Sequence, residues 1–194
     1  LEKAPELLKA LNISKVYLEF FRQTSVSNDD VKKVSGALTQ QGFEIAGGIA
    51  TLPGENYGVR EDAKLGWFNW QAQKTRDDVA KVMSTAAPLF SEIIVDDFFC
   101  TGDMSAESVA AKGELPWGDY RRALMVQAAQ QSIIVPAKSA NPSATLIMKF
   151  PQWYDRFHEF GYDVPAESAM FDRIWVGTET RGPDTARYGF TQPY

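Results

Sequence analysis

Short runs of apolar residues alternate along the chain with longer segments in which apolar residues recur every three or four positions. The short runs are rich in Val, Ile, Tyr and Phe, which is typical of buried strands, and the longer segments have the period of helices that bury one face. The pattern predicts five strands, at 14–21, 43–50, 92–97, 145–150 and 173–176. Because strands and helices alternate, we expect parallel strands joined by crossover helices, and therefore an α/β protein.

Signals for the starts and ends of helices fit this alternation. Ser27 or Asn28 can cap the helix after the first strand, and Thr75 can cap the helix before the third strand. A further helical pattern begins after Trp117. Pro136 should kink that helix, because proline has no N–H to donate to it.

A long segment without strand or helix pattern, 51–74, follows the second strand. Loops of this length in compact domains are usually functional or disordered. Its large aromatic residues include Trp67 and Trp70, which argue against disorder, so we expect a binding loop. Within the preceding strand, Gly47 and Gly48 leave room for close backbone approach or a bulge.

Two architectures fit five such units. An eight-stranded (β/α)8 or TIM barrel typically takes about 250 residues, so this chain of 194 residues would be a single barrel domain, 1–194, that is incomplete at both ends. An open doubly wound sheet could be complete at this length. The barrel is favoured, because no glycine-rich phosphate turn follows the first strand and polar residues crowd the C-terminal ends of the strands, where barrel enzymes have their active sites.

The composition limits the partners. The net charge of −5 argues against nucleic acid, which is bound through clustered Lys and Arg. No apolar run reaches the roughly 18 residues that cross a membrane, so no membrane contact is expected. Neither argument bears on the oligomeric state, which stays open.

Metal ions and cofactors are not expected either. Cys100 is the single cysteine, which excludes an internal disulfide and a thiolate metal cage. His158, the single histidine, lies in a helical pattern and is expected to pack or to face solvent, which leaves no Ser–His–Asp triad. Asp96, Asp97 and Asp103 could hold a hard cation, but they lack the spacing of a calcium loop.

Carboxylates at strand ends are the candidates for catalysis. Asp96 and Asp97 follow the third strand, and Glu179 with Arg181 follows the fifth. Glycoside cleavage generally needs two carboxyl groups, one to protonate the leaving oxygen and one to act as base or nucleophile. Since neighbouring strand residues face opposite ways, only one of the two aspartates can point into a barrel mouth, and Asp97 is nearer the loop. Structural roles stay open: a turn cap or ion pair for the aspartates, and a salt bridge to Arg181 for Glu179.

Other polar and aromatic residues near the strand ends can bind substrate. Glu19 in the first strand can contact a sugar or pair with Arg22 or Lys149. Lys149 ends the fourth strand and can bind substrate or hold a carboxylate. Flat rings suit the apolar face of a pyranose, and some of the available ones are expected to serve this purpose. The candidates are Trp67 and Trp70 in the long loop and Trp153 and Tyr154 after the fourth strand.

Five segments carry a resemblance to a known family. They are "KVYLEFFR" at 15–22, "GGIATLP" at 47–53, "EIIVDDFFCTGD" at 92–103, "AKSANPSATLIMKFPQWYD" at 137–155 and "FDRIWVGTETRG" at 171–182. In these segments the chain resembles a group of poorly characterised bacterial proteins that are assigned to the glycoside hydrolases and have TIM-barrel folds. The resemblance implies a barrel that hydrolyses a glycosidic bond, with Asp96 or Asp97 as first catalytic candidate and Glu179 as second. Members with extra cysteines after the Asp-Asp-Phe differ from this chain, which has Cys100 alone, so no shared role follows for that loop.

Three functions remain open. The first is hydrolysis of an oligo- or polysaccharide by acid/base chemistry, which would favour a secreted or periplasmic location. The second is a non-catalytic carbohydrate-binding barrel. The third is a lyase or aldolase in which Lys149 forms a Schiff base, which requires an amine that lies away from carboxylates. The carboxyl separation would distinguish the first two, at about 5 to 5.5 Å for a retaining and 6.5 to 9.5 Å for an inverting hydrolase.

Overall fold

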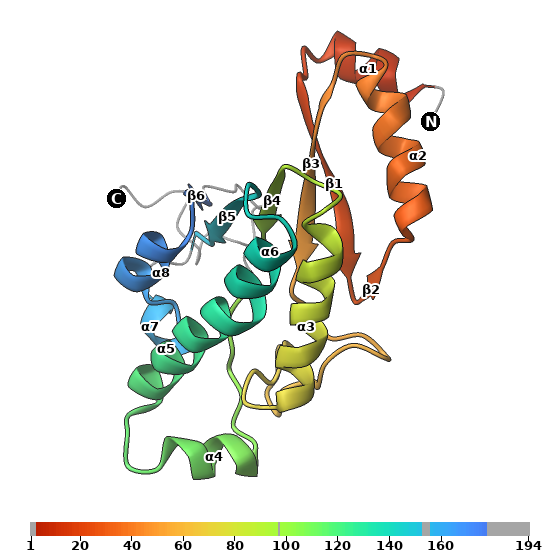
Figure 1. Ribbon diagram of the computed structural model, residues 1–194. Helices are drawn as coiled ribbons and strands as arrows, with labels where there is room; N and C mark the ends of the chain where they lie inside the picture. The colour runs from red at the N-terminus through yellow and green to blue at the C-terminus, as the bar shows by residue number, and fades with distance from the viewer. Residues whose placement is uncertain (1–2, 97, 153–155, 178–194) are drawn as a thin grey trace.

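The computed structural model describes residues 3–96, 98–152 and 156–177, and within them it has one sheet of six strands (Figure 1). The strands are β1 (Lys15–Arg22), β2 (Thr24–Ser25), β3 (Glu44–Ala50), β4 (Glu92–Val95), β5 (Thr145–Phe150) and β6 (Arg173–Val176). Their order in the sheet is β2-β1-β3-β4-β5-β6. β2 is a short antiparallel addition to β1, and the other five run parallel. The prediction of an α/β protein with five parallel strands is confirmed.

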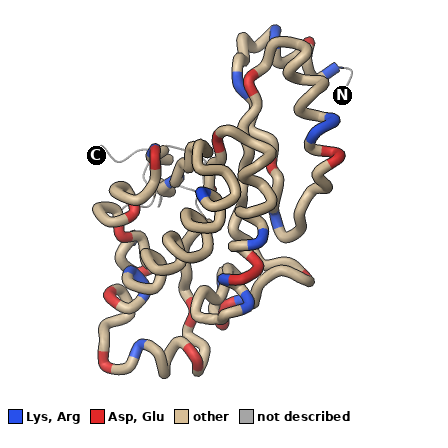
Figure 2. The backbone as a smooth tube through the Cα atoms, in the orientation of Figure 1, with Lys and Arg blue, Asp and Glu red and all other residues tan. Residues whose placement is uncertain are grey.

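Helices follow one another around the outside of the sheet (Figure 1). They are α1 (Ala4–Ala10), α2 (Asn28–Thr39), α3 (Gln73–Ala86), α4 (Ala106–Lys112), α5 (Trp117–Ala128), the π-helical turn η1 (Ala129–Ile134), α6 (Val135–Ala140), α7 (Phe157–Phe160) and α8 (Val164–Met170). No helix among the described residues is long and apolar enough to cross a membrane. Positive and negative residues are interspersed along the described backbone (Figure 2).

Two helix features match their sequence signals. Ser27 caps α2, and its hydroxyl oxygen accepts a hydrogen bond from the Asp30 amide at 3.1 Å. The helix that begins at Trp117 is irregular before Pro136, where the π-helical turn η1 separates α5 from α6. Because proline has no N–H to donate to the carbonyl oxygen one turn earlier, the hydrogen-bond pattern of the helix changes at this point.

The prediction that Thr75 caps a helix is wrong. The helix α3 begins two residues earlier, and Thr75 is buried inside it. Its hydroxyl oxygen accepts a hydrogen bond from the Val59 amide at 2.9 Å, and the Asp78 carboxylate accepts one from the Gly58 amide at 2.7 Å. Both side chains therefore satisfy the backbone of the long loop 51–72 instead of the start of their own helix.

The core lies between the sheet and the helices. Strand residues on this side are fully buried, among them Ile49, Ile93, Val95, Leu146 and Met148. They form one apolar cluster with buried residues of α3, α5 and η1. Burial of this face is the main source of stability, because the helices cover a nearly continuous apolar surface.

Gly47 and Gly48 serve different purposes. A Cβ atom at Gly47 would lie 2.6 Å from the Phe90 ring, so this glycine allows close packing on the helix side. A Cβ atom at Gly48, on the other face, would make only ordinary contacts, the nearest at 3.6 Å from the Glu19 Cα. The irregularity in pairing lies in the neighbouring strand β1, between Glu19 and Phe21.

The other face of the sheet is concave. The rings of Tyr17 on β1 and Trp175 on β6 lie edge to face on it, with centroids 5.2 Å apart. Three strands separate β1 from β6, so in a flat sheet these strands would be four spacings of about 4.8 Å apart, or roughly 19 Å. The sheet must therefore curve strongly for the two rings to touch. The five parallel strands also keep their sequence order, without the reversal of a doubly wound sheet.

Candidate functional site

The concave face has a hollow of about 260 Å³ towards the C-terminal ends of the strands. Its lining includes the charged residues Glu19, Asp96 and Lys149, the aromatic residues Tyr17 and Trp175, and Gly48. These residues come from five parallel strands or their ends, which shows how the curvature of the sheet concentrates them. Polar groups that converge in a concave, partly apolar pocket are typical of a ligand site.

Asp96 is held at the rim of this hollow by its backbone and by two cations. Its amide donates to the Ile49 carbonyl oxygen at 2.9 Å, which continues the pairing of β4 with β3. The Lys149 Nζ lies 3.3 Å from Asp96 Oδ1, and an Arg22 nitrogen lies 3.8 Å from Oδ2. Arg22 Nε also donates to Glu19 Oε2 at 2.7 Å. The structure thus brings together four predicted residues, and Glu19 forms the pairing with Arg22 that the sequence allowed.

The arrangement orients Asp96 without burying it. Its side chain is 28% exposed, so a ligand in the hollow can reach it. Lys149 extends from β5, and its ion pair with Asp96 differs from the isolated amine that the Schiff-base alternative requires. The geometry therefore favours carboxylate chemistry over amine chemistry at this rim.

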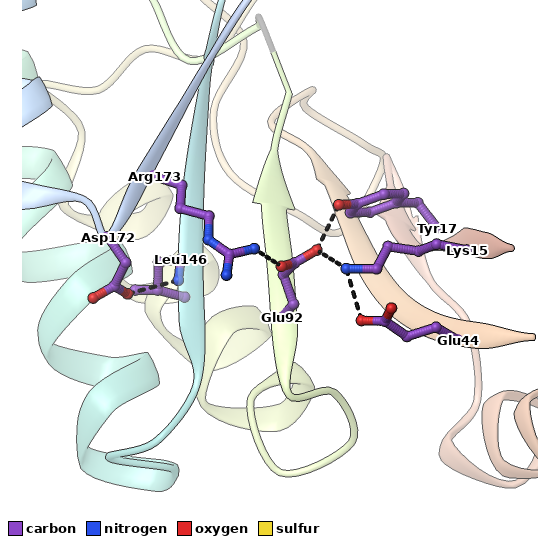
Figure 3. A network of polar contacts seen from close by, with 7 residues as sticks. All are labelled: Lys15, Tyr17, Glu44, Glu92, Leu146, Asp172 and Arg173. Carbon is purple, nitrogen blue, oxygen red and sulfur yellow. Dashed lines mark hydrogen bonds and ion pairs between the residues drawn. The ribbon is translucent and has the colours of Figure 1, made fainter.

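A second layer of charges lies at the opposite, N-terminal ends of the strands (Figure 3). The buried Glu92 of β4 accepts hydrogen bonds from Lys15 at 3.0 Å, from Tyr17 and from Arg173 at 2.6 Å. Lys15 also pairs with Glu44 at 2.7 Å. These residues come from four strands, and none of them was predicted from the sequence to belong to a site.

The pKa values in this layer reflect burial and hydrogen bonding. Burial raises the pKa of Tyr17 to about 12, and its hydrogen bond to Glu92 adds to the effect. Burial alone would raise the pKa of Glu92, but hydrogen bonds from Tyr17 and Lys15 outweigh it, so the pKa is lowered. The N-terminal ends of parallel strands in barrels are usually associated with stability rather than catalysis. We therefore interpret this layer as structural.

The sequence as a whole matches a known protein family. The family model described as "Probable glycosyl hydrolase, catalytic domain" matches residues 2–194. The chain belongs to this family. An uncharacterized protein of Saccharolobus solfataricus is 28% identical over 211 residues, which cover 97% of this chain and 36% of that protein. The chain thus spans about a third of the length of this curated relative.

Of the three carboxylates predicted to be catalytic, one lies within the described residues. Asp96 lies at the hollow, whereas the sequence slightly favoured its neighbour. Five predicted residues of the site lie outside the described residues: Asp97, Glu179, Arg181, Trp153 and Tyr154. Their roles, and the separation of the catalytic carboxyl groups, stay predictions.

The two tryptophans of the long loop do not line this hollow. Trp70 is fully buried, donates its indole N–H to the Cys100 carbonyl oxygen at 3.2 Å, and packs edge-on against Phe99. It offers no surface to a sugar, which corrects its interpretation as a substrate contact. Trp67 is partly buried, and its ring packs against that of Phe160 with centroids 5.4 Å apart. These two tryptophans thus anchor the loop to other segments of the chain.

A buried polar cluster fixes the same loop beside the site. The Glu61 carboxylate accepts a hydrogen bond from the Gly102 amide at 2.7 Å, and Asp103 accepts one from the Asp62 amide at 2.8 Å. Arg121 of α5 donates to the Gly102 carbonyl oxygen at 2.8 Å. The cluster therefore ties the long loop to the segment that follows Asp96, through residues that are distant in sequence.

The acids of this cluster are structural. Burial raises the pKa of Glu61. Burial also acts to raise the pKa of Asp103, but hydrogen bonds from Ser105 and Ser108 outweigh it and lower the pKa. Asp103, considered from the sequence as a cation ligand, thus already has polar partners. Within the described ranges, no three His, Cys, Asp or Glu side chains are grouped to hold a metal ion.

Proposed function

We propose that the five parallel strands are five of the eight in a (β/α)8 barrel. Alternate strands of such a barrel contribute side chains to a common interior layer. The first and fifth parallel strands here provide Lys15 and Arg173, and both bind Glu92 of the third parallel strand. In a ring of eight, the first and fifth strands lie opposite each other, which agrees with the contact between Tyr17 and Trp175. The remaining strands of the proposed barrel would lie outside the described residues.

The proposed activity of this barrel is hydrolysis of a glycosidic bond in an oligo- or polysaccharide. The observation that carries the proposal is Asp96, a reachable carboxylate at the C-terminal end of β4 that two cations orient into a hollow. Catalytic residues of barrel enzymes come from these strand ends. Family membership supports the reaction class, and a carbohydrate substrate follows from it.

The carboxylates would divide the chemistry between them. Protonation of the leaving oxygen creates an oxocarbenium-like transition state, whose positive charge a nearby carboxylate stabilises. Asp96, with Lys149 and Arg22 beside it, suits the role of base, nucleophile or electrostatic partner. Asp97 and Glu179 are the proposed proton donors, and Arg181 would orient Glu179 or hold a sugar hydroxyl.

A glycan-panel hydrolysis assay on the full-length protein tests this proposal. Asp96→Asn keeps the shape of the side chain but removes its charge, so kcat should fall by about 100-fold or more. Asp97→Asn and Glu179→Gln should each lower kcat for the same reason. Asp119→Asn is the control, because Asp119 pairs with Arg122 on the surface of α5. Unchanged hydrolysis in all three site variants would refute the assignment, and sugar binding without hydrolysis in the wild type would indicate a binding barrel.

A further inference from the structure

Trp175 is a large aromatic residue that the concave face leaves accessible. It is 43% exposed and lies on β6, the edge strand of the described sheet. Lys149 is its register partner on β5, so both side chains point to the same face of the sheet. Trp175 lines the same hollow as Asp96 and Lys149. Its exposed ring surface is therefore next to the proposed catalytic carboxylate.

Tyr17 holds this indole in place. The two rings meet at an interplanar angle of 69°, with Tyr17 at the edge-to-face distance given above. The Tyr17 hydroxyl is itself fixed, because it donates a hydrogen bond to the buried Glu92. A ring that is fixed before a ligand arrives costs little conformational entropy on binding.

Gly48 leaves the space beside this ring open. Packing does not require glycine at this position, since a Cβ atom would make only ordinary contacts, and its φ is not in the left-handed region. This distinguishes it from Gly47, where a side chain would collide with Phe90. The missing side chain at Gly48 therefore serves the hollow rather than the fold.

The size and chemistry of the hollow fit one sugar ring. Pockets for drug-sized ligands have volumes of about 300 to 1,000 Å³, so a hollow of about 260 Å³ suits a single monosaccharide unit. A pyranose has an apolar face of C–H groups and a rim of hydroxyl groups. The indole of Trp175 matches the face, and the charges of Glu19, Asp96 and Lys149 match the rim.

We propose that this hollow is a subsite for one pyranose ring, which packs its apolar face on Trp175 and occupies the volume left open at Gly48. The inference rests on the proposed hydrolase function and assigns within it the residues that position the sugar. Trp175 would act through contact with the sugar face, so its loss should weaken binding more than it slows the chemical step.

Saturation-transfer NMR on the full-length protein, with methyl glycosides of glucose, galactose, mannose and xylose as probes, measures this binding directly. The ring protons on one face of the bound sugar should show the strongest saturation. Trp175→Leu should weaken binding about tenfold, and Trp175→Phe should restore part of the loss. Gly48→Val should fill the hollow and abolish binding. Val176→Ala is the control, because Val176 follows Trp175 on the same strand and its side chain therefore faces away from the hollow.

Hydrolysis kinetics on the same variants separate this proposal from the proposed function. A KM that rises about tenfold in Trp175→Leu, with kcat changed much less, supports the subsite. Sugar binding that depends on Trp175 and Gly48 in a protein without hydrolysis also supports it, while removing the hydrolase proposal. Binding and KM unchanged in both Trp175→Leu and Gly48→Val would overturn the subsite and leave the hydrolase standing. Failure of all four probes to bind the wild type would overturn it as well.

Discussion

Two buried glutamates, Glu92 and Glu167, have opposite electrostatic surroundings. Glu92 accepts hydrogen bonds from two cations and a tyrosine, and its pKa is lowered. Glu167 is fully buried in α8, and neither carboxylate oxygen has a hydrogen-bond partner among the described residues. Burial raises the pKa of Glu167 well above its ordinary value, and the nearby charge of Asp163 adds to this. Their contributions to stability should therefore depend on pH in opposite ways.

Glu92→Gln should destabilise the protein most at neutral pH. Because the folded state lowers the pKa of Glu92, its contribution is fully present above the unfolded pKa of about 4.3 and is lost as the pH falls through the folded pKa. We expect a loss of about 1 to 3 kcal/mol in the free energy of unfolding at pH 7, measured by urea denaturation, and a smaller loss at pH 3. Glu44→Gln, at an exposed position in the same layer, should have a much smaller effect. A loss that stays the same at both pH values would contradict this account.

Glu167→Gln should have the opposite effect. The raised pKa means that the folded state keeps a proton which the unfolded state releases, so wild-type stability falls as the pH rises above about 4.3. The variant lacks this fall, so its stability relative to the wild type should be greater at pH 7 than at pH 4. Thermal unfolding at pH 4 and pH 7 measures the difference, with the exposed Glu107→Gln as control. Equal stability of the variant and the wild type at both pH values would refute the prediction.

Residues at strand ends could be predicted from the sequence, but inward-facing residues within strands could not. Asp96 and Lys149 stand out because they interrupt or end apolar runs. Trp175 and Glu92 were missed, because a tryptophan or a charge within a short strand reads equally well as core or edge. Which face each one occupies depends on register, and which residues it meets depends on curvature. Neither property is contained in the local pattern.

At the scale of elements, the long loop 51–72 is held by side chains from the helix that follows it. Thr75 accepts a hydrogen bond from the Val59 amide, so Thr75→Val should leave that amide without its acceptor. We expect a loss of about 1 to 2 kcal/mol and faster hydrogen exchange at Val59. Thr85→Val on the same helix is the matched control, because the Thr85 hydroxyl only donates to the Lys81 carbonyl oxygen within α3. Exchange at Val59 that is equally slow in both variants would rule out this role of Thr75.

Element boundaries agreed with the sequence prediction where an apolar run has clear polar ends. They differed where a side chain bonds to a distant segment or where a helix is short. The strands β5 and β6 coincide with their predicted ranges, because each is a short apolar run between polar turns. The helix α4 was not predicted, since it is short and buries only Ser108. Thr75 looked like a cap, but its oxygen is used by a loop that the local sequence does not identify as its partner.

At the scale of the whole molecule, curvature joins residues that a flat sheet would keep apart. Lys15 on β1 and Arg173 on β6 both bind Glu92 on β4. In a flat sheet the outer two strands would be roughly 19 Å apart, and their substitutions would affect stability independently. The curved sheet places them in one network. A coupling energy between the two positions therefore tests whether both cations share Glu92.

A double-mutant cycle of Lys15→Met and Arg173→Met should show such coupling. Removal of either cation makes Glu92 depend more on the other, so the double variant should lose more stability than the sum of the single losses, by on the order of 0.5 kcal/mol. Salt should reduce the coupling, because Arg173 is partly exposed. Lys15→Met with Arg122→Met is the control cycle and should be additive, since Arg122 pairs with Asp119 on α5. Strict additivity in the first cycle would contradict the shared binding of Glu92 by the two cations.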